Sequence, residues 1–147
     1  MVLQIGDTAP PIKIFEFDLA KFRGQKVVLF FYPKSDTPGC TTEACEFRDA
    51  AKTFAKKDAV IVGLSPDKAP AQQKFATKYG LPFTLVPDPE HAIAEAYGVW
   101  KEKSMYGRKY MGIERTTFIV DEKGKIAHVF AKVKPKGHAA EVLEALG

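Results

Sequence analysis

Residues 26–45 of the chain read KVVLFFYPKSDTPGCTTEAC, and this stretch decides the fold. Its first part, residues 26–32, is a continuous apolar run rich in β-branched and aromatic residues, a pattern typical of a strand buried on both faces. Strands of this kind belong to parallel sheets with helices on both sides. A loop with two prolines and a glycine follows, and a helical pattern begins at about Cys40. The stretch therefore predicts a strand, a loop and a helix in succession.

The same strand pattern returns at residues 59–64, and a shorter candidate strand lies at residues 83–86. Between the first two strands, apolar residues recur at helical spacing, namely Ala44, Phe47, Ala51, Phe54 and Ala55. The opposite, polar face is expected to consist of Glu43, Arg48, Asp49, Lys52 and Lys56. We expect one amphipathic crossover helix here, so that residues 26–64 form a strand–helix–strand unit.

Two further helices are predicted after the second strand. One spans about residues 70–79, where Pro70 lies in the first turn and Gly80 supplies the stop signal. The other spans about residues 90–97 and ends before Gly98. Both lengths suit helices that connect strands within an α/β protein.

The last part of the chain predicts two strands, at residues 115–121 and 125–130, joined by a tight turn that contains Gly124. These strands form an antiparallel hairpin, and an amphipathic helix with Leu143 and Leu146 on its apolar face follows it. Together the elements predict an α/β fold, a thioredoxin-like sandwich in which a central mixed β-sheet is flanked by helices. We expect residues 1–147 to form a single domain.

Composition weighs against several classes of protein. Of 147 residues, 46% are hydrophobic and 27% are charged, which is normal for a soluble globular protein. Lys and Arg outnumber Asp and Glu by 22 to 18, but the lysines are dispersed without a long basic run, so no nucleic-acid partner is expected. Residues 1–11 lack the pattern of a targeting signal, and no apolar stretch approaches the roughly 18 residues of a membrane span. We therefore expect a cytoplasmic protein without a membrane partner.

Cys40 and Cys45 are the residues most able to carry chemistry. In a cytosolic protein, a pair of cysteines is more often catalytic, redox-sensing or metal-binding than a permanent disulfide. Cys40 lies in the expected first turn of the helix, where unpaired backbone N–H groups and the helix dipole stabilise an anion and hence a thiolate. An isolated cysteine at such a place is more often a small buried side chain. The preceding Pro38 and Gly39 and the second cysteine favour a reactive thiol.

No metal or bound cofactor is expected. His91, His128 and His138 are far apart and have no metal-ligand spacing with the cysteines, so each is expected at the surface or in packing. The chain also lacks a glycine-rich phosphate loop, a Ser/His/Asp order and a flavin motif. The cysteine pair therefore has no competitor as the candidate active site.

Two overlapping patterns around Cys40 carry a resemblance to a known family. They are Pro33-x-x-x-Thr37-x-x-Cys40 and Thr37-Pro38-Gly39-Cys40-Thr41-x-Glu43-Ala44-Cys45. Both closely resemble the active-site motif of the peroxiredoxins, with the best match to the Q, or bacterioferritin comigratory protein, subfamily. The resemblance extends from about Gly24 to the C-terminus and includes Phe83-Thr84-Leu85, Tyr97-Gly98-Val99-Trp100 and Arg115-Thr116-Thr117-Phe118.

The resemblance implies a thiol-dependent peroxidase that reduces hydrogen peroxide and organic hydroperoxides. It makes Cys40 the peroxidatic cysteine, which is oxidised to a sulfenic acid, and Cys45 the resolving cysteine, which closes an intramolecular disulfide. Thioredoxin, or glutaredoxin in its place, would reduce this disulfide, and no bound cofactor would be needed. Because both cysteines lie on one chain, the reaction does not require a dimer, and we expect a monomer.

By the same resemblance, Pro33, Thr37 and Arg115 shape the peroxide pocket. The Thr37 hydroxyl can bond to the peroxide or the thiolate, although a threonine here can equally cap the helix. Arg115 offers fixed donors to developing oxygen charge, although an arginine at the start of a strand is often solvated or ion-paired. Glu43, one turn beyond Cys40, could hold Arg115 or serve as a capping partner, and we leave it outside the expected catalytic set.

Two other functions fit the cysteines less well. A thiol–disulfide oxidoreductase usually carries two cysteines separated by two residues, whereas four residues separate Cys40 from Cys45. A non-catalytic redox sensor or holdase would use disulfide formation to change its binding surface. Of the three candidates, only a peroxidase turns over catalytically on peroxide.

Overall fold

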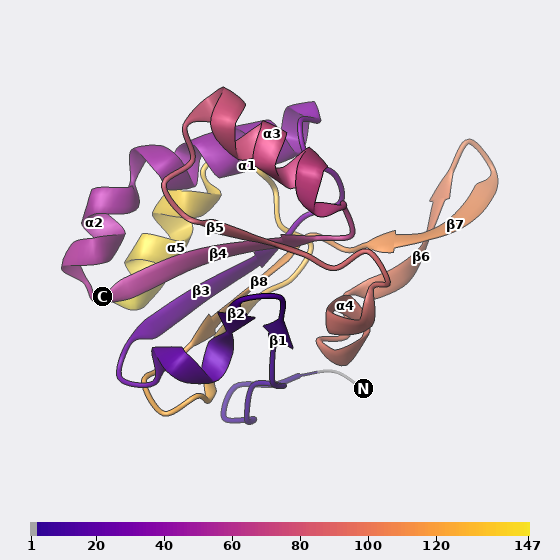
Figure 1. The fold of residues 1–147 in the computed structure, drawn as a ribbon. Helices are drawn as coiled ribbons and strands as arrows, with labels where there is room; N and C mark the ends of the chain where they lie inside the picture. The colour runs from indigo at the N-terminus through magenta and orange to yellow at the C-terminus, as the bar shows by residue number, and fades with distance from the viewer. Residues whose placement is uncertain (1–2) are drawn as a thin grey trace.

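A computed structural model of the chain describes residues 3–147. Its centre is a five-stranded sheet in the order β5–β4–β3–β8–β9, with helices packed on both faces (Figure 1). The strands are β3 (Lys26–Phe31), β4 (Ala59–Ser65), β5 (Thr84–Pro87), β8 (Thr116–Val120) and β9 (Ile126–Phe130). The helices are η1 (Leu19–Phe22), α1 (Pro38–Asp49), α2 (Ala51–Lys56), α3 (Ala69–Tyr79), α4 (Ala92–Ala96) and α5 (His138–Leu146). The predicted α/β sandwich is confirmed.

Strand β3 lies at the middle of the sheet, as its apolar sequence predicts. It pairs in parallel with β4 and antiparallel with β8, so the sheet is mixed. Its side chains alternate between two cores, with Val27, Leu29 and Phe31 on one face and Val28 and Phe30 on the other. Each such side chain contributes roughly 1.5–3 kcal/mol by its burial. Because β3 is held at both edges and on both faces, its carboxyl end is a rigid support for the loop that follows.

Helices α1, α2, α3 and α5 cover the face that contains Phe30. Their fully buried side chains include Phe47, Phe54, Phe75 and Val142, and the rings of Phe30 and Phe47 stack with 4.8 Å between their centroids. The other face is covered by residues that precede β3 and by α4. Burial of α1 against the sheet orients its first turn relative to the end of β3.

The crossover between β3 and β4 differs from the expected single helix in one respect. The helix is interrupted at Ala50 (φ −96°, ψ 0°), which ends α1 and precedes α2. Helical hydrogen bonds continue across the interruption, since Phe54 N donates to Ala50 O at 3.1 Å. The interruption is therefore a distortion at one residue. No glycine or proline marks the position, so the sequence pattern cannot indicate it.

Two hairpins lie outside the central sheet. The first is formed by β1 (Lys13–Ile14) and β2 (Phe17–Asp18), and the second by β6 (Trp100–Met105) and β7 (Arg108–Ile113), which projects from the body of the molecule (Figure 1). The sequence pattern does not predict the second hairpin, because polar and charged residues are frequent in its strands and it lacks the Asn-Gly turn signal. Its turn has positive φ at Tyr106 (52°) and Gly107 (77°), as a type I′ turn requires.

The remaining expected elements are present with shifted ends. Gly80 ends α3 in the left-handed conformation (φ 59°), and Gly124 N donates to Asp121 O at 3.0 Å in the turn between β8 and β9. Helix α4 is shorter than the pattern of residues 90–97 predicts. None of the helices within residues 3–147 is long and apolar enough to cross a membrane.

Candidate active site

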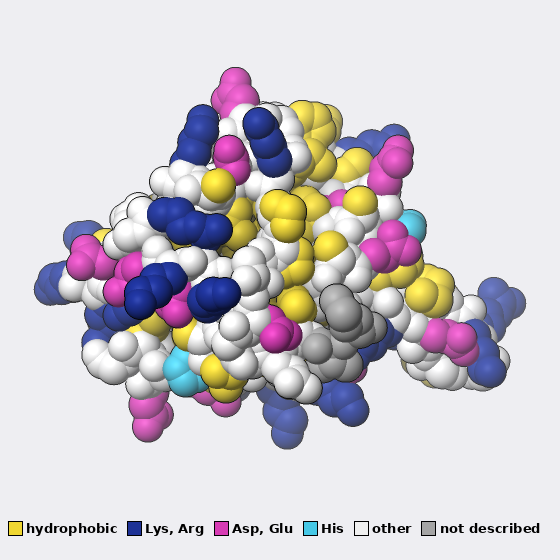
Figure 2. Space-filling model, turned by 90° about the horizontal axis from the view of Figure 1, so that it is seen from below, with side chains coloured by type: hydrophobic (Ala, Val, Ile, Leu, Met, Phe, Trp, Pro, Cys, Tyr) yellow, Lys and Arg dark blue, Asp and Glu magenta, His cyan; other side chains and the backbone are white. Residues whose placement is uncertain are grey.

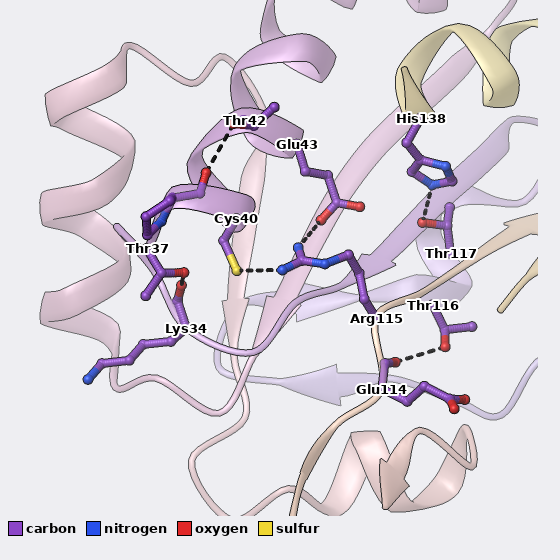
Figure 3. Close-up of polar contacts among 11 residues, drawn as sticks. Lys34, Thr37, Cys40, Thr42, Glu43, Glu114, Arg115, Thr116, Thr117 and His138 are labelled. Carbon is purple, nitrogen blue, oxygen red and sulfur yellow. Dashed lines mark hydrogen bonds and ion pairs between the residues drawn. The ribbon is translucent and has the colours of Figure 1, made fainter. Parts of the chain in front are cut away.

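Cys40 lies in the first turn of α1, after the loop that leaves β3, as the sequence predicts (Figure 3). Thr37 precedes the helix with an extended backbone, and Pro38 is the first helical residue. Thr41 N donates to Thr37 O at 2.8 Å, so the N–H groups of Gly39 and Cys40 have no partner within the helix. The Cys40 residue is only 1% exposed. Free N–H groups and the helix dipole favour negative charge at this sulfur.

Arg115 approaches the sulfur from the segment between β7 and β8. The next residue, Thr116, begins β8 opposite Phe31 at the end of β3, so the pairing of these strands brings Arg115 to the loop that follows β3. Arg115 Nη2 donates to Cys40 Sγ at 3.2 Å, and the Arg115 side chain is 15% exposed (Figure 3). A guanidinium at this distance stabilises a thiolate and offers further donors to an atom that approaches the sulfur.

Glu43 is buried in the same cluster, and its expected place on the polar face of the helix is wrong. Its Oε1 accepts a hydrogen bond from Arg115 Nη1 at 2.7 Å, and Glu43 is 1% exposed (Figure 3). The buried residues of α1 are Cys40, Glu43, Ala44 and Phe47, which is the spacing of one helix face. Helical periodicity alone would have placed Glu43 on the buried face. A carboxylate is tolerated there because Arg115 pairs with it.

Burial also affects the protonation state of each member of this ion pair. It raises the pKa of Glu43 to about 7, although the Arg115 charge acts in the opposite direction. Glu43 Oε2 has no hydrogen-bond partner within residues 3–147, so the carboxylate is only partly satisfied. Burial acts to lower the pKa of Arg115, but the neighbouring Glu43 and Cys40 raise it overall. Arg115 is therefore a cation at neutral pH, while Glu43 titrates near neutrality.

The loop of residues 32–37 carries Pro33 and Thr37. The Thr37 hydroxyl donates to Lys34 O at 2.8 Å and makes no capping bond to α1, so the capping alternative is wrong. Its oxygen keeps acceptor capacity for another donor. Ser35 N donates to Asp67 Oδ2 at 2.8 Å, which ties the loop to the residues after β4. Pro33 is half-buried at the start of this loop and offers no N–H of its own.

Gly39 leaves room for the guanidinium. A Cβ at this position would lie 3.3 Å from both Arg115 Nη2 and Pro135 Cγ. Val133 N also donates to Arg115 O at 2.9 Å. The segment of residues 131–137 therefore packs against both Arg115 and the first turn of α1, and a side chain at Gly39 would disturb that contact.

Cys45 lies in the same helix as Cys40 but apart from it. Both are free thiols, and Cys45 is half-buried. Five residues of ideal helix separate two Cα atoms by about 8.7 Å. A disulfide usually requires a Cα separation of roughly 4.4–6.8 Å. The structure thus brings Arg115 to Cys40 but does not bring Cys45 there, and the two sulfurs cannot bond while the helix is intact.

His138 lies outside this cluster and is buried, in agreement with its expected packing role. Its Nε2 is 2.7 Å from Thr117 Oγ1 (Figure 3). Its Nδ1 is 2.8 Å from Glu141 Oε1. Burial lowers the pKa of His138. No group of three or more His, Cys, Asp and Glu residues within the described part of the chain is arranged to hold a metal ion.

Comparison with known proteins points to one family over nearly the whole chain. The model of the AhpC/TSA family matches residues 5–129. Peroxiredoxin Bcp of Bacillus subtilis is 48% identical, and the match covers 99% of this chain and 96% of that protein. A mutant PrxQ structure from Xylella fastidiosa has a TM-score of 0.91 at 35% identity and covers 99% and 96%. Structures of the Xanthomonas campestris bacterioferritin comigratory protein, which concern its alkyl peroxide reduction activity, give a TM-score of 0.88 at 38% identity and cover 99% and 96%.

Proposed function

Since the chain belongs to the AhpC/TSA family and to its peroxiredoxin Q, or Bcp, branch, we propose that its thiol peroxidase reaction takes place at Cys40. The observation that carries this proposal is the 3.2 Å hydrogen bond from Arg115 Nη2 to the Cys40 sulfur in the first turn of α1. It joins a nucleophile to a cation that stabilises both the thiolate and oxygen charge beside it. The substrates are hydrogen peroxide and organic hydroperoxides, in keeping with the alkyl peroxide reduction described for the X. campestris relative.

In the first half-reaction, the Cys40 thiolate attacks one oxygen of the peroxide. An S–O bond forms as the O–O bond breaks, the leaving oxygen takes a proton and departs as water or an alcohol, and Cys40 becomes a sulfenic acid. Arg115 and the N–H of Cys40 donate to the oxygen that gains charge. The Thr37 hydroxyl accepts the hydrogen bond of the bound peroxide, and Pro33 helps to keep water from the pocket.

In the second half-reaction, the Cys45 thiol attacks the sulfenic acid, water leaves and an intramolecular disulfide forms. A dithiol partner then reduces this disulfide by exchange, so that its two thiols become a disulfide and both cysteines become thiols again. Thioredoxin is the partner we propose, with the enzyme acting as a monomer in the cytoplasm. Residues 1–147 are proposed to act as one domain.

Disulfide formation is expected to unwind the first turn of α1, because the helical distance between the cysteines is too long for a bond. That turn is the easiest to open, since its N–H groups lack helical partners and Gly39 adds backbone freedom. Phe47, which is fully buried, should hold the rest of the helix to the sheet. Hydrogen exchange measured by mass spectrometry should therefore be faster across residues 40–47 in the oxidised protein than in the reduced protein.

Strand β3 serves as the internal control for this experiment, because its exchange should be the same in both redox states. A Cys45→Ser variant treated with peroxide provides the matched sample, since it is oxidised at Cys40 but cannot form the disulfide. Equal protection of residues 40–47 in both states, with the disulfide confirmed by mass, would mean that the helix does not open.

Replacing Glu43 with glutamine is expected to slow the peroxide step by about tenfold, because the amide loses a charge-assisted bond worth roughly 1.5 kcal/mol that fixes Arg115. The pH dependence gives a second readout. With its pKa near 7, Glu43 ionises as the pH rises through neutrality, so its hold on Arg115 strengthens in that range. In the unmodified enzyme, ionisation of Glu43 should add to the rise in the stopped-flow rate of the peroxide step between pH 6 and pH 8. This contribution should be absent from Glu43→Gln. Identical pH profiles would argue that Glu43 does not position Arg115.

A coupled assay of peroxide-dependent NADPH oxidation with thioredoxin and its reductase tests the proposed function. Sustained turnover on peroxide is expected. A thiol–disulfide oxidoreductase would reduce protein disulfides without a requirement for peroxide. A redox sensor or holdase would consume about one peroxide per chain and then stop, and either result would contradict the proposed reaction.

A further inference from the structure

A segment with three closely spaced lysines lies beside the active site in the structure. The segment between β9 and α5, residues 131–137, contains Lys132, Lys134 and Lys136 and no acidic residue. All three lysines are exposed, while Val133 and Pro135 between them are half-buried. The alternation means that one side of the segment packs on the protein and the three lysines remain in solvent.

This segment borders the reactive cluster directly. Val133 N donates to Arg115 O at 2.9 Å, and Pro135 Cγ would be 3.3 Å from a Cβ at Gly39. Gly137 N donates to both carboxylate oxygens of Glu46 on α1, at 2.9 and 3.1 Å. The three lysines therefore lie beside the turn of α1 that has to open for the disulfide to form.

Hairpin β6–β7 adds to this positive region. Lys103 stands opposite Tyr110 and Met105 stands opposite Arg108, and by strand alternation these four residues share one face of the hairpin. The hairpin leads directly into the reactive cluster, because β7 ends at Ile113, two residues before Arg115. Burial and the Arg115 charge lower the pKa of Lys103, while Cys40 acts to raise it. Figure 2 shows the hairpin as the protrusion on the right, where hydrophobic, basic and acidic side chains are all exposed.

The positive charges in this region lack acidic partners. Within residues 3–147, none of five residues forms an ion pair, namely Lys103, Arg108, Lys132, Lys134 and Lys136. We call these five residues the basic rim. In contrast, Lys101 and Lys109 of the same hairpin are paired with Glu114 and Glu102. Unpaired like charges repel one another, so the rim is better suited to an acidic partner than to an isolated surface.

Exposed apolar side chains complete the surface. Met105 is 55% exposed and Tyr106 is 98% exposed at the tip of the hairpin, and Tyr110 is 43% exposed on the face that carries Lys103. Tyrosine, methionine and arginine are the residue types enriched at protein–protein interfaces. A surface of this composition beside a reactive disulfide fits a protein partner that must come close to that disulfide.

We propose that the basic rim and the apolar residues of the hairpin form the docking surface for the protein that reduces the Cys40–Cys45 disulfide, and that this reductant presents an acidic surface. The inference rests on the proposed function, because it requires the disulfide. Complementary charge accelerates encounter by about 10- to 1,000-fold and sets orientation. An anionic lipid surface is a less suitable partner for the basic rim, since the lysines lie beside the turn that opens to expose the disulfide, where the reductant has to approach.

The first test replaces the three basic-rim lysines of residues 131–137 together, as Lys132→Glu/Lys134→Glu/Lys136→Glu. With an acidic thioredoxin as the probe and low salt, kcat/KM for thioredoxin should fall by about tenfold or more. The matched control is Lys52→Glu/Lys56→Glu/Lys123→Glu, which changes the net charge equally at exposed positions away from the active site and should behave like the unmodified enzyme. An equal loss in both triple variants would overturn the proposal.

The second test needs no variant. In the unmodified enzyme, kcat/KM for thioredoxin should fall as salt is raised to about 0.5 M, where charges are screened over a few ångströms. Turnover supported by dithiothreitol, a small uncharged dithiol, should change little. Salt-independent reduction by thioredoxin would overturn the docking surface. Absence of peroxide turnover even with dithiothreitol would instead contradict the proposed function.

Vesicles of phosphatidylglycerol and phosphatidylcholine test the lipid alternative. The basic rim would be assigned to an anionic membrane by two results together. The unmodified enzyme would bind these vesicles, and the triple lysine variant would lose that binding while keeping its kcat/KM for thioredoxin. Loss of thioredoxin-supported turnover without vesicle binding supports the acidic protein partner.

Discussion

Replacing Cys40 with serine is expected to abolish peroxide reduction, whereas Cys45→Ser should still reduce about one peroxide per chain and then stop. A serine hydroxyl is not ionised at neutral pH, so the nucleophile is lost even if Arg115 keeps its position. In Cys45→Ser the 3.2 Å contact between Arg115 and Cys40 is retained, but the sulfenic acid has no thiol with which to condense. Turnover supported by thioredoxin should be lost in both variants.

The two substitutions are matched, because each exchanges one sulfur for oxygen within α1. Dimedone labelling after peroxide treatment, followed by mass spectrometry of peptides, distinguishes them. Strong labelling at Cys40 in Cys45→Ser and none at Cys45 in Cys40→Ser is expected. Equal labelling of Cys45 in Cys40→Ser would reverse the roles of the two cysteines.

Replacing Arg115 with alanine should slow the peroxide step by about a hundredfold, which corresponds to a lost transition-state donor of about 3 kcal/mol. Ionisation of the thiol alone gives a smaller gain in the rate of the peroxide step. An ordinary thiol with a pKa of about 8.5 is about 3% ionised at pH 7, so complete ionisation gains at most about 30-fold. A dedicated peroxidase must also stabilise the leaving oxygen, and Arg115 is the cation in contact with the sulfur.

Loss of Arg115 also leaves Glu43 buried without its partner, which can destabilise the fold by about 3–5 kcal/mol. The double variant Arg115→Ala/Glu43→Gln removes that unpaired carboxylate and separates catalysis from stability. Its peroxide step, measured by stopped flow, should remain at least as slow as in Arg115→Ala. Arg23→Ala, at an exposed position before β3, is the control and should react at the normal rate. A normal peroxide step in the double variant would remove Arg115 from the reaction.

In the helical pattern of residues 40–55, the periodicity and the charge of Glu43 favour different positions for that side chain. Periodicity places Cys40, Glu43 and Phe47 on one face, and the structure buries all three. The charge of Glu43 nevertheless favours solvent, because an unpaired carboxylate is rarely buried. Its partner, Arg115, lies 72 residues away in sequence, so no local pattern can supply the reason for burial.

The amino-acid sequence by itself determined the central strand, predicted at residues 26–32 and observed at Lys26–Phe31, the loop that follows it and the position of Cys40 in the first helical turn. These depend on local hydrophobic patterns and on how a helix begins, which neighbouring residues control. Only the tertiary structure decided the contact between Arg115 and Cys40, across 75 residues, the burial of Glu43 and the position of residues 131–137 beside the site. The position of Arg115, and with it the pairing of Glu43, follows from the order and register of the sheet, in which β8 pairs with β3 and places residue 115 beside the end of that strand. Such pairing is settled by the packing of the whole chain, because the free energy of each strand pair depends on surfaces that distant segments provide.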